Sequence, residues 1–203
     1  MGDKKTKVVL DADVINHFSR AGRLSLLPNI LPEFQFIVLD IVKKELPILI
    51  LADLDKVINQ EKTIAEEVFG ATGGEKKEYF RLTATSGPHL GKGESACMVY
   101  CRYHNDVVGS SNTKDITDYC NQYGITFLTT NDFLFYAIQC GKVVEVTFDD
   151  GGNELERVSM DASAGIFGCV VPAGAWHTVE VLEPSVIMEV KDGRYGEDGS
   201  ESR

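Results

Sequence analysis

Acidic side chains recur along this chain where strands and helices are expected to begin or end. Asp11 follows the apolar run 7–10, Asp132 follows a second apolar run, and Glu94 and Asp115 lie in helix-like stretches. Carboxylates at strand ends of an α/β fold point into the crevice where such folds bind ligands. There they repel one another unless a hard divalent cation lies between them. The pattern therefore predicts a Mg²⁺ or Mn²⁺ site for phosphodiester cleavage.

Each acid also has a purely structural interpretation. Asp11, Asp13 and Asp132 could cap the helices that follow them. Glu94 could satisfy the dipole of its own helix, and Glu45 follows two lysines that are typical of a solvated helix face. Both interpretations stay open until the side chains are placed in space.

The first 143 residues alternate between strand and helix patterns. Short apolar runs predict strands at 8–10, 34–39, 77–84, 106–109 and 125–128. Helical spacing predicts helices at 12–27, 41–46, 51–69, 93–103, 114–123 and 133–140. Alternation of this kind predicts an α/β fold with a parallel sheet covered by helices.

The period changes near Val144. A hairpin turn is expected at 149–153, and the short strands are expected at 144–148, 155–160, 167–171, 177–182 and 186–190. This pattern predicts a small antiparallel segment of about five strands. The polar, glycine-rich residues 193–203 predict a disordered tail. We therefore expect two domains, 1–143 and 144–203.

Charge and composition restrict the function classes. The net charge is −11, which argues against a protein that grips nucleic acid by bulk electrostatics. The acidity is uneven, with 16 Lys and Arg against 19 Asp and Glu in residues 1–145, and 4 against 12 in residues 146–203. Most of the excess negative charge thus lies outside the part that carries the candidate site.

Cysteine usage and hydropathy indicate a cytoplasmic protein. The five cysteines form no Cys-x-x-Cys pair, which disfavours a zinc site and is typical of a reducing compartment. No run of 18 apolar residues is present, so no membrane span is expected.

Four segments of the first part resemble the motifs of PIN-domain ribonucleases in order and spacing. They are VVLDADVI at 8–15, VKKEL at 42–46, LGKGESA at 90–96 and LTTNDFL at 128–134. The resemblance covers residues 6–143. It implies a PIN-like α/β/α sandwich, Mg²⁺- or Mn²⁺-dependent cleavage of RNA and, frequently, a toxin that pairs with an antitoxin protein.

The resemblance carries over to individual residues. It implies catalytic roles for Asp11, Glu94 and Asp132, and metal ligation by these three together with Glu45 and Asp115. Substrate or metal-bound water is expected at Lys92, Ser110, Asn112, Thr130 and Asn131.

One position departs from the family pattern. Many relatives carry an acid directly after the strand at 107–108, where this chain has the residues GSSN at 109–112. Asp115 could reach the same space from the following helix or could lie on the surface. The departure motivates a second hypothesis, a non-catalytic PIN-like protein that binds a partner or nucleic acid.

The C-terminal part resembles the second half of a WbuC-type cupin. The matching segments are FDDGGN at 148–153, GCVVPAGAWHT at 168–178 and MEVKDGRY at 188–195. In a cupin, a histidine placed like His177 ligates a metal. The two further histidines and the glutamate of the first cupin motif are missing upstream, so His177 alone cannot complete a metal site. A cupin-type enzyme of polysaccharide metabolism is the third hypothesis. The open strand edges of a half barrel make a homodimer a further expectation.

Overall fold

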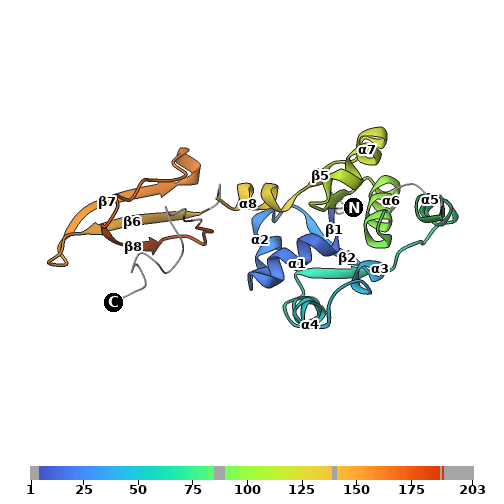
Figure 1. The fold of residues 1–203 in the computed structure, drawn as a ribbon, viewed down its shortest axis with the longest axis horizontal. Helices are drawn as coiled ribbons and strands as arrows, with labels where there is room; N and C mark the ends of the chain where they lie inside the picture. The colour runs from blue at the N-terminus through green and yellow to red at the C-terminus, as the bar shows by residue number, and fades with distance from the viewer. Residues whose placement is uncertain (1–4, 85–89, 139–140, 188, 190–203) are drawn as a thin grey trace. The chain divides into compact units, whose positions relative to one another are not determined.

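The aliphatic run Lys7–Leu10 forms β1, the central strand of a five-stranded parallel sheet in the computed structural model (Figure 1). Its neighbours are β2 (Gln35–Leu39) and β4 (Val107–Gly109), and Val9 pairs with Ile37 on one side and Val108 on the other. The outer strands are β3 (Ile64–Glu67) and β5 (Phe127–Leu128), which gives the order β3-β2-β1-β4-β5. The predicted α/β class with a parallel sheet is confirmed.

The structure describes residues 5–84, 90–138, 141–187 and 189. The chain divides into two compact units, Met1–Leu134 and Phe135–Arg203. Among the described residues, no helix combines the length and the apolar character that a membrane span requires.

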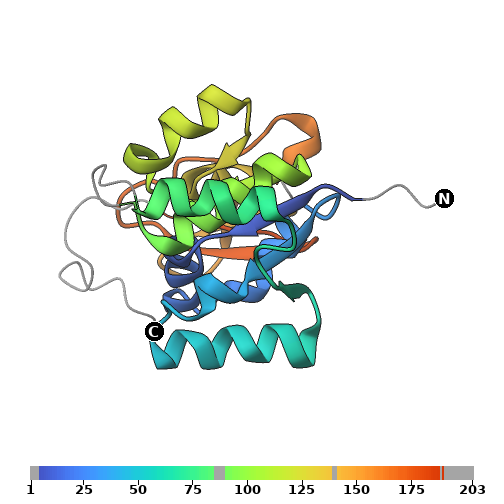
Figure 2. The same ribbon diagram turned by 90° about the vertical axis from the view of Figure 1, so that its right-hand side faces the viewer.

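Helices flank the sheet of the first unit. Their bounds are α1 Ala12–Arg20, α2 Leu27–Ile30, α3 Asp40–Lys43, α4 Ile48–Lys56, α5 Gly73–Ala84, α6 Lys92–His104, α7 Thr113–Tyr123 and α8 Thr130–Ile138. Two shorter turns are η1, the 3₁₀ turn Leu24–Leu26, and η2, the π turn Val57–Glu61. Helix α6 packs against β1, β2 and β4, and α5 and α7 pack against α6. Figure 2 shows α5 and α6 side by side.

The core explains why the central strands carry no polar side chain. Val8, Val9 and Leu10 are fully buried, and six consecutive residues of α6, 96–101, are buried as well. A parallel sheet covered by helices has no solvated face, so its strands are continuous apolar runs. The first polar residue after β1 is therefore placed by the end of the strand.

Two predicted elements have the wrong type. The helix expected at 51–69 is instead α4, the π turn and the edge strand β3. Lys62 adopts a left-handed conformation with φ 57°, which ends the helix and lets Ile64 pair with Phe36. The strand expected at 77–84 lies in helix α5, whose first turn is fixed because Thr72 and Glu75 bond each other's backbone N–H groups.

The long helix expected at 12–27 is also interrupted. Helix α1 ends at Arg20, and Gly22 turns the chain with φ +64° before the 3₁₀ turn begins at Leu24. The helix expected at 133–140 starts three residues earlier, at Thr130, and its last two predicted residues lie outside the described part of the chain.

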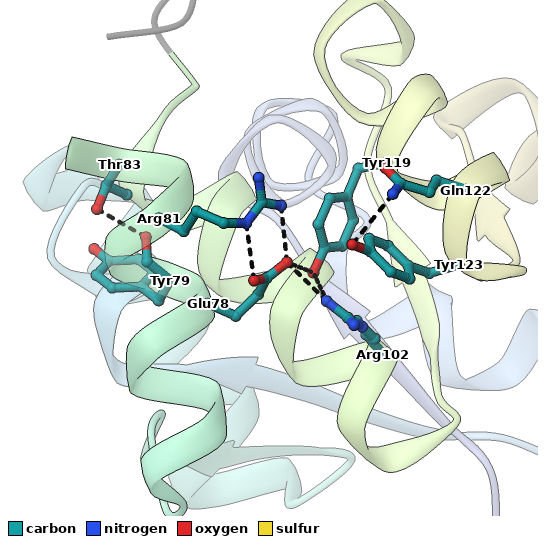
Figure 3. Close-up of polar contacts among 8 residues, drawn as sticks. All are labelled: Glu78, Tyr79, Arg81, Thr83, Arg102, Tyr119, Gln122 and Tyr123. Carbon is teal, nitrogen blue, oxygen red and sulfur yellow. Dashed lines mark hydrogen bonds and ion pairs between the residues drawn. The ribbon is translucent and has the colours of Figure 1, made fainter. Parts of the chain in front are cut away.

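A polar cluster joins α5, α6 and α7 (Figure 3). Glu78 accepts hydrogen bonds from Arg102 at 2.7 Å, from Tyr119 at 3.0 Å and from both sides of the Arg81 guanidinium at 2.9 Å. The Arg102 guanidinium also lies 3.5 Å from the ring centre of Tyr123. The carboxylate of Glu78 is thus matched by two guanidinium groups.

The second unit contains an antiparallel sheet of three strands in the order β7-β6-β8. These are β6 (Lys142–Phe148), β7 (Glu154–Asp161) and β8 (Trp176–Val181), and a short 3₁₀ turn, η3, spans Ala162–Ala164. The expected hairpin turn joins β6 to β7, where the carboxylate of Asp149 accepts bonds from Asn153.

The expected number of five strands is wrong for the described part of this unit. Residues 167–171 are extended without pairing into a strand, because only an isolated bridge at Ile166 precedes them. Val186, Ile187 and Glu189 lie in no strand either. The rest of the segment 186–190 and the expected disordered tail lie outside the described residues.

Candidate metal centre

The sheet order changes direction at β1, which places a crevice at the carboxyl ends of β1 and β4. Asp11 follows β1 directly, and its N–H donates to the carbonyl of Gly109 at 2.8 Å. The loop 110–112 follows β4. In open α/β sheets, ligands bind at such a switch point. Chain topology therefore puts Asp11 where a ligand is expected.

A cleft of about 410 Å³ lies at this point. Its lining residues are Asp11, Ala12, Asp13, Asn16, Glu45, Gly91, Glu94, Asn112 and Asp115. Five of them are carboxylates and two are amides, and none of these lining residues is lysine, arginine or histidine. The described wall of the cleft is thus a concentration of negative charge without a matching cation.

Asp11 is the most buried of these acids, with 3% of its surface exposed. Burial raises the pKa of Asp11 to about 7, and the charges of Asp13 and Glu94 act in the same direction. The N–H of Ala12 at 2.8 Å and the hydroxyl of Ser110 at 3.2 Å donate to it and offset part of that rise. A carboxylate held at this cost is a candidate functional group.

Glu45 enters the cleft from the turn after α3 because position 93 is glycine. The N–H of Gly93 donates to Glu45 Oε1 at 3.0 Å. A Cβ at position 93 would lie 2.5 Å from Glu45 Oε2 and 3.2 Å from Asp11 Oδ1. Any other residue would displace one of these carboxylates. The glycine therefore brings two acids together against α6.

Glu94 stands at the first turn of α6, where its Oε2 accepts from the N–H of Gly91 at 3.1 Å. Its Oε1 accepts from the side-chain amide of Asn112. Burial raises the pKa of Glu94, and the charges of Asp115 and Asp13 add to the rise. The helix-cap interpretation of Glu94 is correct for one oxygen, while the other oxygen faces the acids of the cleft.

Asp13 and Asn16 also line the cleft, although the predicted ligand set contains neither. Asp13 accepts from the N–H of Val14 at 2.6 Å and of Ser111 at 2.7 Å. A spacing of three residues puts Asp13 and Asn16 on one face of α1. That spacing, directly after Asp11, is the signal in the sequence that could have identified them.

Asp132 is not among the residues that line the cleft. One of its oxygens accepts from the backbone N–H and the hydroxyl of Thr129, both at 2.7 Å. This carboxylate fixes the turn that begins α8, as the cap interpretation predicts.

The remaining predicted contacts are divided between the cleft and its surroundings. Ser110 is buried against Asp11, and Asn112 lines the cleft. Lys92 and Asn131 are exposed and do not line it. Thr130 forms part of a chain of hydrogen bonds, from Ser111 at 2.8 Å and to the His17 ring at 2.9 Å. This chain links α8 to the loop that holds Asp13.

The donor set of the cleft fits a hard divalent cation, but the ligands are not assembled around one. All candidate donors are carboxylate or amide oxygens, which Mg²⁺ and Mn²⁺ prefer. The buried Oδ1 of Asn16 has no hydrogen-bond partner, so an acceptor is available there. Within the described ranges, however, no three His, Cys, Asp or Glu side chains are arranged to hold a metal. The carboxylates instead face backbone and amide donors.

His177 of the second unit has no such surroundings. Its Nδ1 lies 3.2 Å from the carbonyl of Ala175, and its Nε2 lies 3.6 Å from Glu189. The absence of an assembled metal group in the described part of the chain applies here too. The resemblance to a cupin gains no support from this geometry.

No protein-family model matches the sequence, and no curated protein is significantly similar to it. Among solved structures, a PilT N-terminus domain protein from the archaeon Sulfolobus solfataricus P2 is similar, with 10% identity and a TM-score of 0.43. That alignment covers 63% of this chain and 90% of the other. FitAcB from Neisseria gonorrhoeae is 13% identical with a TM-score of 0.40, over 61% and 97% of the two chains. At these values the function must be argued from the site.

Proposed function

We propose that the chain is a metal-dependent endoribonuclease of the PIN type. The observation that carries the proposal is the gathering of five carboxylates in one cleft at the switch point of a parallel sheet, with no cationic side chain in its described lining. Like charges are brought together at such a cost when a bound cation repays it. The four motifs in PIN order support the same conclusion.

In this proposal Asp11, Glu45 and Glu94 hold Mg²⁺ or Mn²⁺, with Asp13 and Asp115 on the opposite wall. The metal supplies an activated water and neutralises charge on the scissile phosphate. Ser110 orients Asp11 through its hydroxyl hydrogen bond.

Residues around the cleft have supporting roles in the proposal. Asp132 holds the turn at Thr129 and Thr130, where Asn131 is exposed to a passing RNA strand. Lys92 is exposed on the first turn of α6, beside Glu94, and is the proposed phosphate contact.

The substrate proposed is single-stranded RNA. Because the cleft is acidic and the chain carries a net charge of −11, the cation supplies the attraction for phosphate. As the resemblance implies, the proposal includes an antitoxin protein as partner, a cytoplasmic setting and a homodimer.

The test is Mn²⁺-stimulated cleavage of single-stranded RNA by the full chain and by Asp11→Asn. We expect cleavage by the wild-type chain and its loss in the variant. Asp118→Asn is the matched control, because Asp118 is exposed on α7 and does not line the cleft. Cleavage by Asp11→Asn at the wild-type rate would contradict the proposal.

One observation favours the second candidate, a non-catalytic PIN-like binding protein. No three acids of the described residues are arranged to hold a metal as they stand. Calorimetry separates the two candidates. If millimolar Mn²⁺ produces no binding heat with the full chain, the protein acts by binding alone.

A further inference from the structure

Asn112 occupies the N-cap of α7 but does not use its side chain as a cap. The residue has φ −80° and ψ 62°, and no side-chain bond to the first turn of α7 is formed. An asparagine at this position normally accepts a hydrogen bond from an N–H of the first turn. Here the backbone carbonyl of Asn112 accepts from Asp115 and Ile116 instead, at 3.1 and 3.3 Å. The side chain is thereby left to lie in the cleft.

The amide nitrogen of Asn112 bridges two acids of the cleft. It donates to Oε1 of Glu94 and, at 2.8 Å, to Oδ2 of Asp115. One NH₂ group has two protons, so a single amide can satisfy both carboxylates. The partial positive charge of the amide therefore lies between two negative charges, as a bound cation would.

The other amide of the cleft is oriented differently. The buried Oδ1 of Asn16 has no donor and is already an available oxygen ligand. Asn112 presents its nitrogen, which cannot ligate a cation. The carbonyl oxygen of Asn112 is at the other end of the same planar group. Rotation by about 180° about its last side-chain torsion, which is broad and two-fold for asparagine, would exchange the two ends.

We propose that Asn112 is a two-state residue that controls metal affinity in this cleft. Without metal, its NH₂ group stands in for the cation between Glu94 and Asp115. With metal, the amide turns and presents its oxygen as a ligand. This inference rests on the proposed function, because it requires that the cleft binds a divalent cation. It also gives a physical reason why the acids form no assembled metal group among the described residues.

The direct test follows the Asn112 side-chain NH₂ signals of the ¹⁵N-labelled full chain by NMR while Mg²⁺ is added. The backbone N–H groups of Gly93 and Ser111, which donate to Glu45 and Asp13, report binding of the cation independently. We expect these signals to move and the Asn112 NH₂ protons to lose their hydrogen-bonded shift and exchange faster with water.

The possible outcomes separate this inference from the proposed function. If the signals of Gly93 and Ser111 move while the Asn112 NH₂ signals keep their shift and exchange rate, the two-state role is wrong and the cation site stands. If no signal in the cleft moves at millimolar Mg²⁺, the cation site is wrong and the role of Asn112 is wrong with it.

A substitution tests the same role without NMR. Asn112→Asp removes the bridging donor and adds an oxygen ligand of the same shape, so we expect Mn²⁺ to bind about tenfold more tightly. We also expect the metal-free variant to melt at a lower temperature than the wild-type chain. Asn121→Asp carries the same charge change on the exposed far end of α7 and should leave Mn²⁺ affinity unchanged. Unchanged or weaker Mn²⁺ binding by Asn112→Asp would overturn the inference.

Discussion

The acidic cleft and the Glu78 cluster are both rich in polar side chains, and both involve α6 and α7, but their charges are organised in opposite ways. In the cluster, the Glu78 carboxylate is bonded to Arg81 and Arg102, and these contacts together with Tyr119 lower its pKa (Figure 3). In the cleft, the pKa values of Asp11 and Glu94 are raised. Matched charges stabilise the fold. Unmatched charges weaken it and are retained where a ligand compensates them.

The largest expected difference comes from making the same substitution in both regions. Glu94→Gln should reduce Mn²⁺-dependent RNA cleavage by about 100-fold or more, because it removes a ligand charge that acts on the cation. The metal-free variant should be at least as stable as the wild-type chain, because one repulsive charge is gone. Glu78→Gln should show the reverse, a lower melting temperature with Mn²⁺ affinity unchanged. Calorimetry and thermal melting measure both quantities, and a common response to the two changes would remove the distinction between the regions.

A raised and a lowered pKa also predict opposite effects of pH on the metal-free protein. The Asp11 carboxyl keeps its proton in the folded state up to about pH 7 and loses it near pH 4 when unfolded. Its contribution to stability is thus complete below about pH 4 and disappears as the pH rises through about 7, an effect of up to about 4 kcal/mol.

Glu78 contributes in the other direction. Because its pKa is lowered by Arg81, Tyr119 and Arg102, its contribution is present above about pH 4.5 and is lost as the pH falls. Melting curves from pH 4 to 8 in the presence of a chelator should lose their downward trend in Asp11→Asn and keep it in Glu78→Gln. An unaltered trend in Asp11→Asn would show that another group is responsible.

The third prediction concerns the arginine that crosses between α6 and α7. Arg102→Ala should lower the free energy of unfolding by about 1–3 kcal/mol, because a partly buried carboxylate and the Tyr119 hydroxyl lose a charged partner. Arg81→Ala is the control, since this side chain is 53% exposed and an exposed ion pair contributes up to about 1 kcal/mol. Denaturant unfolding measures the difference. Equal losses would mean that burial of the pair is not what matters.

The smallest predicted effect is that of Gly93→Ala. The added Cβ meets the flexible end of Glu45, so stability should change by less than about 1 kcal/mol. Mn²⁺ affinity should fall a few-fold because Glu45 loses its position against Asp11. Gly73→Ala is suited as a control, because a Cβ there meets nothing within 4 Å. Unchanged Mn²⁺ affinity in Gly93→Ala would remove Glu45 from the cation site.

The sequence predicts the buried centre of the sheet better than its edge. The strands β1, β2 and β4 are apolar runs with few alternatives, and the structure contains them where they are expected. The edge strand β3 has the sequence IAEE, and its pattern is as compatible with the end of a helix. Its pairing with β2 is a tertiary contact that no local pattern reveals.

The candidate site shows a similar division. Asp11, Glu94 and Asp115 are predicted from their places at element ends, and the cleft contains all three. Asp132 also follows a strand, but its local bonds to Thr129 orient it along the turn. The contribution of Asn112 depends on a side-chain direction, which differs from its usual direction at an N-cap.

Helix α5 has a consequence for how the first unit opens. Its one buried side chain is the acid Glu75, which bonds His104, and between Ile64 and Ala96 no described apolar side chain belongs to the core. The helix is therefore held by hydrogen bonds and ion pairs, while the five-stranded sheet is held by apolar burial. In terms of local unfolding, α5 is a separate cooperative segment of low stability. It can detach and return without disturbing the sheet that positions Asp11.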